Sequence, residues 1–176
     1  MTSDQIIANL EQLANAQAIE GMARFGIRPA QALGISIPTL RKMAKDIGRN
    51  QALALALWDS GIHEARILAS MIAEPQLVSA ELMEEWVNDF DAWDVCDQVC
   101  GNLFDKTPYA YQKAKEWCQQ EKEFVRRVFG WRLDIFRLQN CLDEFIGPGG
   151  DFHFQGFWER SRRCFVRVHR PRIDFL

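Results

Sequence analysis

Helix start and stop signals constrain the fold of this chain more than any other feature of its sequence. Ser3 is placed to cap a helix, and apolar side chains recur at helical spacing after it, at Ile6, Ile7, Leu10 and Leu13. Pro38 opens the segment PTLRKMAKDIG, and Gly48 is positioned to end it. Over the first 138 residues the sequence has no alternating strand pattern with hairpin turns. The sequence therefore predicts an all-α fold.

Two later segments carry equally clear helix signals. Ser79 precedes AELMEEWVNDF, whose first turn holds acidic residues that favour the positive end of the helix dipole. Thr107 precedes PYAYQKAKEWCQQ, where its hydroxyl can accept from unpaired backbone amides while Pro108 occupies the first helical position. We therefore expect helices that begin at residues 80 and 108.

A weak internal repeat suggests how the helices are arranged. Three segments align on a polar residue late in the first turn of a helix, namely residues 63–70, 94–101 and 124–131. The aligned residues are Arg66, Asp97 and Arg127, which lie 31 and 30 positions apart. This spacing fits stacked antiparallel helix pairs, a HEAT-like repeat solenoid, in which equivalent second helices line one concave surface. The three polar residues would then face one groove, although so short an alignment also arises by chance.

The helical pattern stops near Phe145. We expect a helical-repeat domain over residues 1–146 and an irregular basic and aromatic tail over residues 147–176, where Gly, Pro, aromatics and Arg follow no stable period. Residues 160–172 are rich in arginine, and can either bind phosphate or form a solvated basic segment.

Charge, hydropathy and cysteine content narrow the class of protein. With 48% hydrophobic residues, the chain of 176 residues can bury the core of one soluble domain. It shows neither a signal-like start nor an apolar run long enough to span a membrane. Its net charge of −3 means that any DNA-facing surface must be a local basic patch. Because the five cysteines form no CxxC pair, we expect free thiols in a cytoplasmic protein, which we take to be a monomer.

The stretch DFDAWDVCDQVC, residues 89–100, holds the main candidate for a functional site. Trp93 and Asp97 are four residues apart and would project from one helix face. A ring face attracts a cation by roughly 0.5–2 kcal/mol, and a carboxylate stabilises a cationic transition state where water is excluded. Together they would make a site for positive charge. Alternatively, Trp93 packs in the core and Asp97 caps a helix or pairs with Arg66 or Arg127.

Other motifs in the sequence give weaker evidence of function. His63 and Glu64 begin like the zinc-protease motif HExxH, but Ile67 stands where the second histidine is needed. Cys96 and Cys100 share a helix face without a further pair of ligands, so buried thiols are favoured over a metal site. We expect neither a metal nor a cofactor.

Three stretches resemble the AlkD-like DNA alkylation repair enzymes, which are helical-repeat DNA glycosylases that excise alkylated purines. They are GIRPAQALGISIPTLRKMAK at 26–45, LWDSGIHEARILAS at 57–70 and DFDAWDVCDQVCGNLFDKTPYA at 89–110. The resemblance extends roughly over residues 20–128, and its most specific part is the W-D-x-x-D stretch.

The resemblance implies a role for several residues. Asp97 would be the catalytic aspartate, and Trp93 would contact the nucleotide that carries the lesion. Arg127, or Arg126 beside it, would bind the DNA backbone near the lesion, and Arg66 is a further candidate for that contact. The implied reaction is metal-independent hydrolysis of the N-glycosidic bond of cationic 3-methyl- or 7-methylpurines. The implied partner is double-stranded DNA that contains alkylated bases.

From about Val128 onward the sequence departs from the family, which usually has a further helical repeat that adds another aromatic to the groove. Trp131 or Trp158 can take that place. The alternative prediction is a truncated or degenerate member of the family, a non-catalytic helical-repeat module that binds DNA or a protein.

Overall fold

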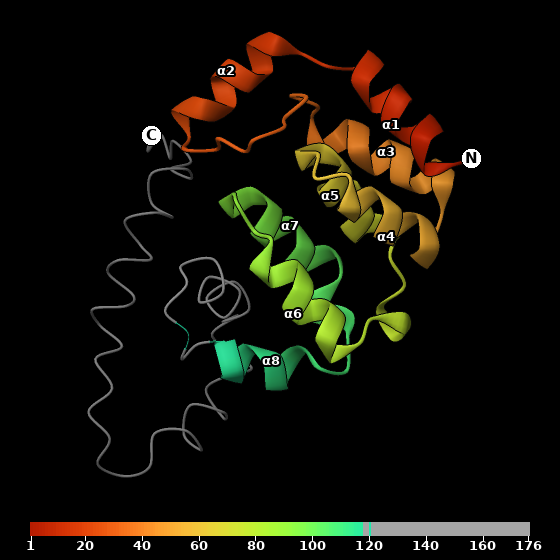
Figure 1. Ribbon diagram of the computed structural model, residues 1–176, viewed down its shortest axis with the longest axis vertical. Coiled ribbons are helices and arrows are strands. Elements are labelled where there is room, and N and C mark those ends of the chain that lie inside the picture. The colour runs from red at the N-terminus through yellow and green to blue at the C-terminus, as the bar shows by residue number, and fades with distance from the viewer. Residues whose placement is uncertain (118–119, 121–176) are drawn as a thin grey trace, which may run out of the picture. The chain divides into compact units, whose positions relative to one another are not determined.

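Helices and short connections make up the part of the chain that the structure describes, which is residues 1–117 and 120 of a computed structural model (Figure 1). No strand occurs among these residues, as the all-α prediction requires, and none of their helices is long and apolar enough to cross a membrane. The elements are α1 (Ser3–Gln12), α2 (Ala16–Arg24), α3 (Ile37–Ile47), α4 (Gln51–Asp59), α5 (His63–Ile72), η1 (Pro75–Leu77), α6 (Ala80–Asn88), α7 (Trp93–Asn102), η2 (Phe104–Lys106) and α8 (Ala110–Trp117).

Three of the predicted helix boundaries are confirmed. Ser79 begins α6, where its side chain accepts from the backbone N–H of Leu82 at 3.2 Å. Pro38 lies in the first turn of α3, and Gly48 ends that helix with a φ of 77°. Glycine adopts this left-handed backbone conformation without the steric cost of a side chain.

The first helix begins one residue earlier than its sequence suggests. Thr2, not Ser3, is the cap, since its hydroxyl accepts from the Gln5 backbone N–H at 3.3 Å. The Gln5 side chain accepts from the backbone N–H of Thr2 at 2.9 Å, which completes a reciprocal capping box. Ser3 cannot compete, because a cap there would give up the second of these bonds.

The predicted cap at Thr107 is also wrong. Its hydroxyl donates to the Phe104 carbonyl at 2.8 Å and contacts the Met83 sulfur at 3.5 Å, so it closes η2 instead of starting α8. Helix α8 begins at Ala110, two residues after the expected start at Pro108. Tertiary contacts with α6 thus override a local helix-start signal.

The described helices repeat at the predicted interval. Three hydrogen bonds join residues exactly 31 positions apart in the chain, those of Leu33 with Glu64, Trp58 with Asp89 and His63 with Asp94. Helix α5 packs on α3 on one side and on α7 on the other, and α4 packs against α5 (Figure 1). The segments 63–70 and 94–101 therefore belong to equivalent helices of successive repeats, while the third aligned segment, 124–131, and the predicted tail from residue 147 lie outside the described residues.

Two tryptophans connect the first helices of these repeats. Trp58 of α4 and Trp86 of α6 stack with their ring centroids 3.9 Å apart and their planes 1° from parallel. Both indoles are only 2% exposed. The Trp58 N–H donates to the Asp89 carboxylate at 2.9 Å, so this buried ring keeps its polar group satisfied. Through this stack, one repeat packs against the next.

A buried carboxylate on α5 fixes the loop between α2 and α3. Glu64 is 1% exposed and accepts from three consecutive backbone N–H groups, those of Leu33 at 2.8 Å, Gly34 at 2.6 Å and Ile35 at 3.3 Å. Gly34 has a φ of 73°, and a side-chain carbon there would lie 2.4 Å from the Asn15 carbonyl oxygen. The loop can therefore wrap the carboxylate only with glycine at this position.

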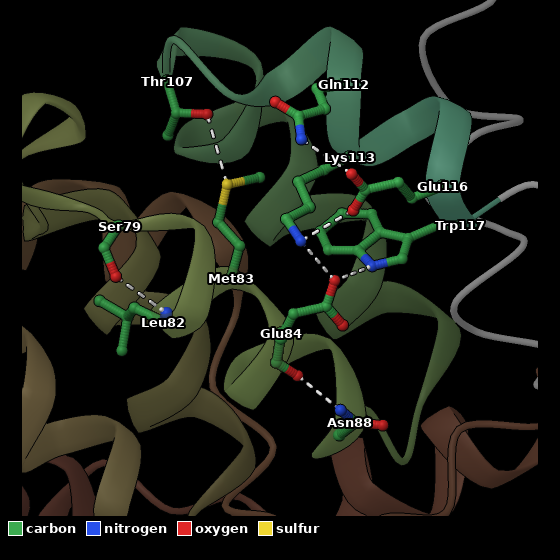
Figure 2. Close-up of polar contacts among 10 residues, drawn as sticks. All are labelled: Ser79, Leu82, Met83, Glu84, Asn88, Thr107, Gln112, Lys113, Glu116 and Trp117. Atoms are coloured by element: carbon green, nitrogen blue, oxygen red, sulfur yellow. Dashed lines mark hydrogen bonds and ion pairs between the residues drawn. The ribbon is translucent and has the colours of Figure 1, made fainter.

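Helix α8 docks on α6 through a second glutamate (Figure 2). The Glu84 carboxylate accepts from the Lys113 ammonium at 2.8 Å and from the Trp117 indole N–H at 2.8 Å. Burial lowers the pKa of Lys113, but its hydrogen bonds with Glu84 and Glu116 outweigh that effect and raise the pKa. Lys113 therefore stays charged. Unlike Glu64, the Glu84 side chain is 41% exposed.

These two glutamates allow a matched test of burial. We expect Glu64→Gln to lower the free energy of unfolding by about 1–3 kcal/mol, because one carbonyl oxygen cannot satisfy three buried N–H donors. Glu84→Gln should cost less than about 1 kcal/mol, since its amide oxygen can still accept and the site is partly solvated. Urea denaturation of both variants measures the difference, and equal losses would contradict the role given to Glu64.

Candidate functional site

Trp93 and Asp97 lie on the same, partly exposed face of α7. Trp93 is the first residue of the helix and Asp97 is one turn further on, and both side chains are half-buried. The opposite face fills the core with Val95, Cys96, Val99 and Cys100. The indole and the carboxylate therefore share one face of the helix, and neither group is sealed in the interior, while their role as a site for positive charge stays a prediction.

The Trp93 ring is held in place from the end of α2. Its indole N–H donates to the backbone carbonyl of Phe25 at 3.1 Å, across 68 positions of the chain, and the ring packs against the core. This bond satisfies the polar edge of the indole. The bond also places the chain segment around Phe25 beside the candidate site.

Phe25 is a candidate contact residue that the sequence pattern did not single out. It ends α2 with its side chain 62% exposed, and Gly26 follows with a φ of 77° that reverses the chain. Arg24 and Arg28 on either side are exposed too. An exposed aromatic between two cations suits a nucleic acid, in which bases stack and phosphates attract. The signal available in the sequence is the Arg-Phe-Gly turn at residues 24–26, where the first stretch that resembles the family begins.

Arg66 is the third predicted site residue in the described part of the chain. Its guanidinium contacts other residues of the protein. Its guanidinium lies 5.3 Å from the Trp58 ring centroid, donates to the Asp89 carbonyl at 3.0 Å and lies 4.0 Å from the Asp89 carboxylate. Its side chain is 16% exposed. Among the described residues it thus pairs with Asp89, and not with Asp97, for which the alternative reading offered Arg66 as one of two partners.

The remaining predicted site residues are not placed by the structure. Arg126, Arg127, Trp131 and Trp158 lie outside the described residues. Their roles stay predictions.

A buried ion pair lies beside Trp93. His63, at the start of α5 and 2% exposed, has its Nε2 atom 2.8 Å from the Asp94 carboxylate of α7. Burial lowers the pKa of His63, but the hydrogen bond with Asp94 and the negative charges of Asp94, Glu64 and Asp91 outweigh burial and raise the pKa. The pair therefore favours the imidazolium form.

The two cysteines of α7 are buried free thiols, as predicted. Burial raises the pKa of Cys100 well above its usual range, and the hydrogen bond with Cys96 and the charge of Asp97 add to the effect. Cys100 is therefore a thiol at neutral pH and unsuited to nucleophilic chemistry.

Two exposed cations, Arg49 and Lys106, lie at the C-terminal ends of α5 and α7. Arg49 donates to the Ala73 carbonyl at the end of α5, and Lys106 donates to the Asn102 carbonyl at the end of α7, at 2.6 Å. Burial and the charge of Arg49 lower the pKa of Lys106, against the opposing effect of Asp105. Their mutual repulsion makes this spot favourable for an anion.

Stacked helix pairs with an indole and a carboxylate on one partly exposed face define a helical-repeat protein with a candidate site for a cationic group. Residues 6–134 match the family of DNA alkylation repair enzymes. The chain belongs to that family.

Two other proteins are similar to this chain. It is 25% identical over 144 residues to an uncharacterised protein of Listeria innocua, a match that covers 80% of this chain and 64% of that protein. A solved structure, described as a new family of proteins related to the HEAT-like repeat DNA glycosylases with affinity for branched DNA structures, matches with a TM-score of 0.67 and 21% identity. That match covers 74% of this chain and 56% of the solved chain. The structural likeness confirms the HEAT-like fold, and the chain spans about two-thirds or less of each relative.

The His63–Asp94 pair makes a prediction about pH. Because folding raises the pKa of His63 above 6.5, the pair stabilises the folded state fully below pH 6.5, and the contribution disappears as pH rises through the pKa of the folded state. The difference in free energy of unfolding between wild type and His63→Gln should therefore shrink as pH rises from 6.5 through the pKa of His63 in the folded state. Denaturation series across this range would check it, and a constant difference would contradict it.

Proposed function

We propose that this protein is a DNA glycosylase that hydrolyses the N-glycosidic bond of cationic alkylated purines in double-stranded DNA. The observation that carries the proposal is the placement of Trp93 and Asp97 on one half-buried face of α7, in a chain that belongs to the DNA alkylation repair enzyme family. The family supplies the substrate class. The structure adds support, because a carboxylate and an aromatic ring share one half-buried helix face.

The substrate sets the demands on the site. A 3-methyl- or 7-methylpurine nucleotide carries a positive charge on the base, so the base leaves as a neutral molecule when the C1′–N bond breaks and takes the bonding electrons. No acid is needed to protonate the leaving group. The sugar becomes oxocarbenium-like, water adds to C1′, and one proton of that water must be removed.

Asp97 fits both remaining tasks. Its carboxylate can stabilise the positive charge that develops on the sugar, which is worth most where water is partly excluded. It can also orient the attacking water and accept its proton. The half-buried position on α7 supports this role, because such a carboxylate is partly shielded from bulk water yet open on one side.

Trp93 supports selectivity for charged bases. The face of an indole attracts a cation, and a neutral purine gains less from the same contact. The bond from its N–H to the Phe25 carbonyl fixes the ring before the substrate arrives. We assign the exposed Phe25 side chain a stacking contact with the DNA beside the lesion.

Positive groups would hold the phosphates. Arg24 and Arg28 flank Phe25, and Arg49 and Lys106 form a second basic spot at the ends of α5 and α7. Such contacts position DNA without reading its sequence. Arg66 has its guanidinium against Trp58 and Asp89, so we assign it mainly to the support of α5. Arg127 or Arg126, and Trp131, keep their predicted places at the DNA backbone and the lesion.

Asp97→Asn tests the catalytic role directly. The amide keeps the size of the side chain but not its charge, so release of methylated purine from alkylated duplex DNA should fall by at least about a hundredfold. The exposed Asp59→Asn at the end of α4 is the matched control and should release base at the wild-type rate. Equal rates for Asp97→Asn and wild type would refute the role.

Two substitutions of Trp93 separate ring from N–H. Trp93→Ala should raise the barrier by about 1 kcal/mol or somewhat more, the value of a lost cation–π contact. Trp93→Phe keeps a ring face and should retain most of the activity, although it loses the bond to Phe25. Single-turnover rates on methylated DNA measure both, and an alanine variant as active as the phenylalanine variant would argue against the ring contact.

A second candidate is a DNA-binding module without catalysis, and the solved structure with affinity for branched DNA structures favours it. Under this alternative the chain would bind a four-way junction more tightly than linear duplex and release no methylpurine from either. Binding should weaken steeply with salt if phosphates dominate the contact. Gel-shift and base-release measurements on the same preparation distinguish the two candidates.

A further inference from the structure

Two of the helices α1 to α7 lack the side-chain hydrogen bond that caps the rest of them. Among α1 to α7, only α5 and α7 have an N-cap residue, Ile62 or Ala92, whose side chain makes no capping hydrogen bond. The same two helices are joined at their starts by the contact of His63 with Asp94, at 2.8 Å. His63 is the first residue of α5 and Asp94 is the second of α7. A contact between the helices thus stands where each would otherwise have its own cap.

Asp94 is placed to transmit this contact to the candidate site. It follows Trp93 directly, and Asp97 lies three residues further along the same helix. The Trp93 indole is held independently by the Phe25 carbonyl at 3.1 Å. A helical turn fixed at two neighbouring residues cannot rotate freely about its axis, so these contacts set the direction in which Trp93 and Asp97 project.

The charges around His63 make its hold on Asp94 sensitive to protonation. Asp94 and Asp91 act on the imidazole from α7 and the segment before it, and Glu64 acts from α5 itself. The segment before α3 contributes the Gln31 carbonyl, which accepts from the His63 backbone N–H at 2.9 Å. His63 Nδ1 and Asp94 Oδ1 are buried without a hydrogen-bond partner among the described residues. With one hydrogen bond between them, the strength of the pair depends on the charge of the imidazole.

We propose that His63 is a positioning residue for the Trp93–Asp97 site, and that its imidazolium, by holding Asp94, sets the orientation of the first turn of α7. The proposal rests on the proposed glycosylase function for its effect on catalysis. The orientation of Trp93 itself is a property of the folded chain and can be measured without DNA. Loss of the imidazolium proton loosens the turn, so base release falls as pH rises.

The direct test follows the indole N–H of Trp93 by NMR in the full chain labelled with ¹⁵N-tryptophan. Its resonance is identified as the one that Trp93→Phe removes. We expect it to shift with a midpoint above pH 6.5 in wild type and to stay constant over the same interval in His63→Gln. A variant that replaces the other two histidines, His153 and His169, by glutamine should titrate like wild type. No shift in wild type, or an equal shift in His63→Gln, overturns the proposal.

The kinetic arm measures release of methylated purine from alkylated duplex DNA across the same pH range. Wild type should lose activity on the order of tenfold as pH rises through the titration, a fraction of the roughly hundredfold that a 1 Å displacement can cost. His63→Gln should be slower than wild type at low pH and show no such decline. Identical pH profiles overturn the positioning role in catalysis.

The NMR titration and the kinetic measurement test different claims, so either one can fail without the other. If wild type releases no base at any pH while Trp93 titrates as expected, the proposed glycosylase function is wrong and the positioning by His63 stands. If base is released but Trp93 does not titrate, the reverse holds. The wild-type titration does not depend on His63→Gln, so if that variant folds poorly, which thermal melting would reveal, the absence of a Trp93 shift in wild type still overturns the proposal.

Discussion

Two adjacent ionisable side chains buried on α5 hold successive parts of the chain in register. Glu64 reaches back to three backbone N–H groups of the loop before α3, while its neighbour His63 reaches forward to Asp94 on α7. Taking charges out of water is costly, and the cost is recovered only when each finds its partner in good geometry. A packing shifted by a helical turn would leave these groups buried and unpaired. Apolar contacts alone would tolerate such a shift more readily, because hydrophobic packing is not directional.

The same contacts fix the position of the candidate site. Trp93 and Asp97 stand on the helix that His63 holds, and the end of α2 closes on the same turn through the Phe25 carbonyl. The end of α2 and the start of α5 therefore both contact the first turn of α7. The proposed reaction would suit this arrangement, because a cationic base is already a good leaving group and the protein would mainly have to place charge correctly.

Local signals in the sequence predict the fold well, and long-range contacts account for what they miss. Caps at Ser79 and the stop at Gly48 depend on neighbouring residues, so they can be read directly, and the four-residue spacing of Trp93 and Asp97 fixes their shared face on any helix. Thr107 carries an equally good cap signal, but a partner on α6 and the closure of η2 claim its hydroxyl. In the sequence His63 and Glu64 resemble an incomplete metal motif, and their actual partners cannot be read from it, because those partners lie 29 to 31 positions away in opposite directions.

The Trp58–Trp86 stack has an optical consequence. Two indoles that lie parallel with centroids 3.9 Å apart are close enough for their electronic transitions to couple, and each belongs to a different repeat. The far-ultraviolet circular dichroism of the folded chain, where the strongest indole transitions lie, should therefore contain an exciton component that neither tryptophan would produce alone. Such a signal reports the seating of one repeat on the next without any label, and it would vanish if the repeats separated while their individual helices survived.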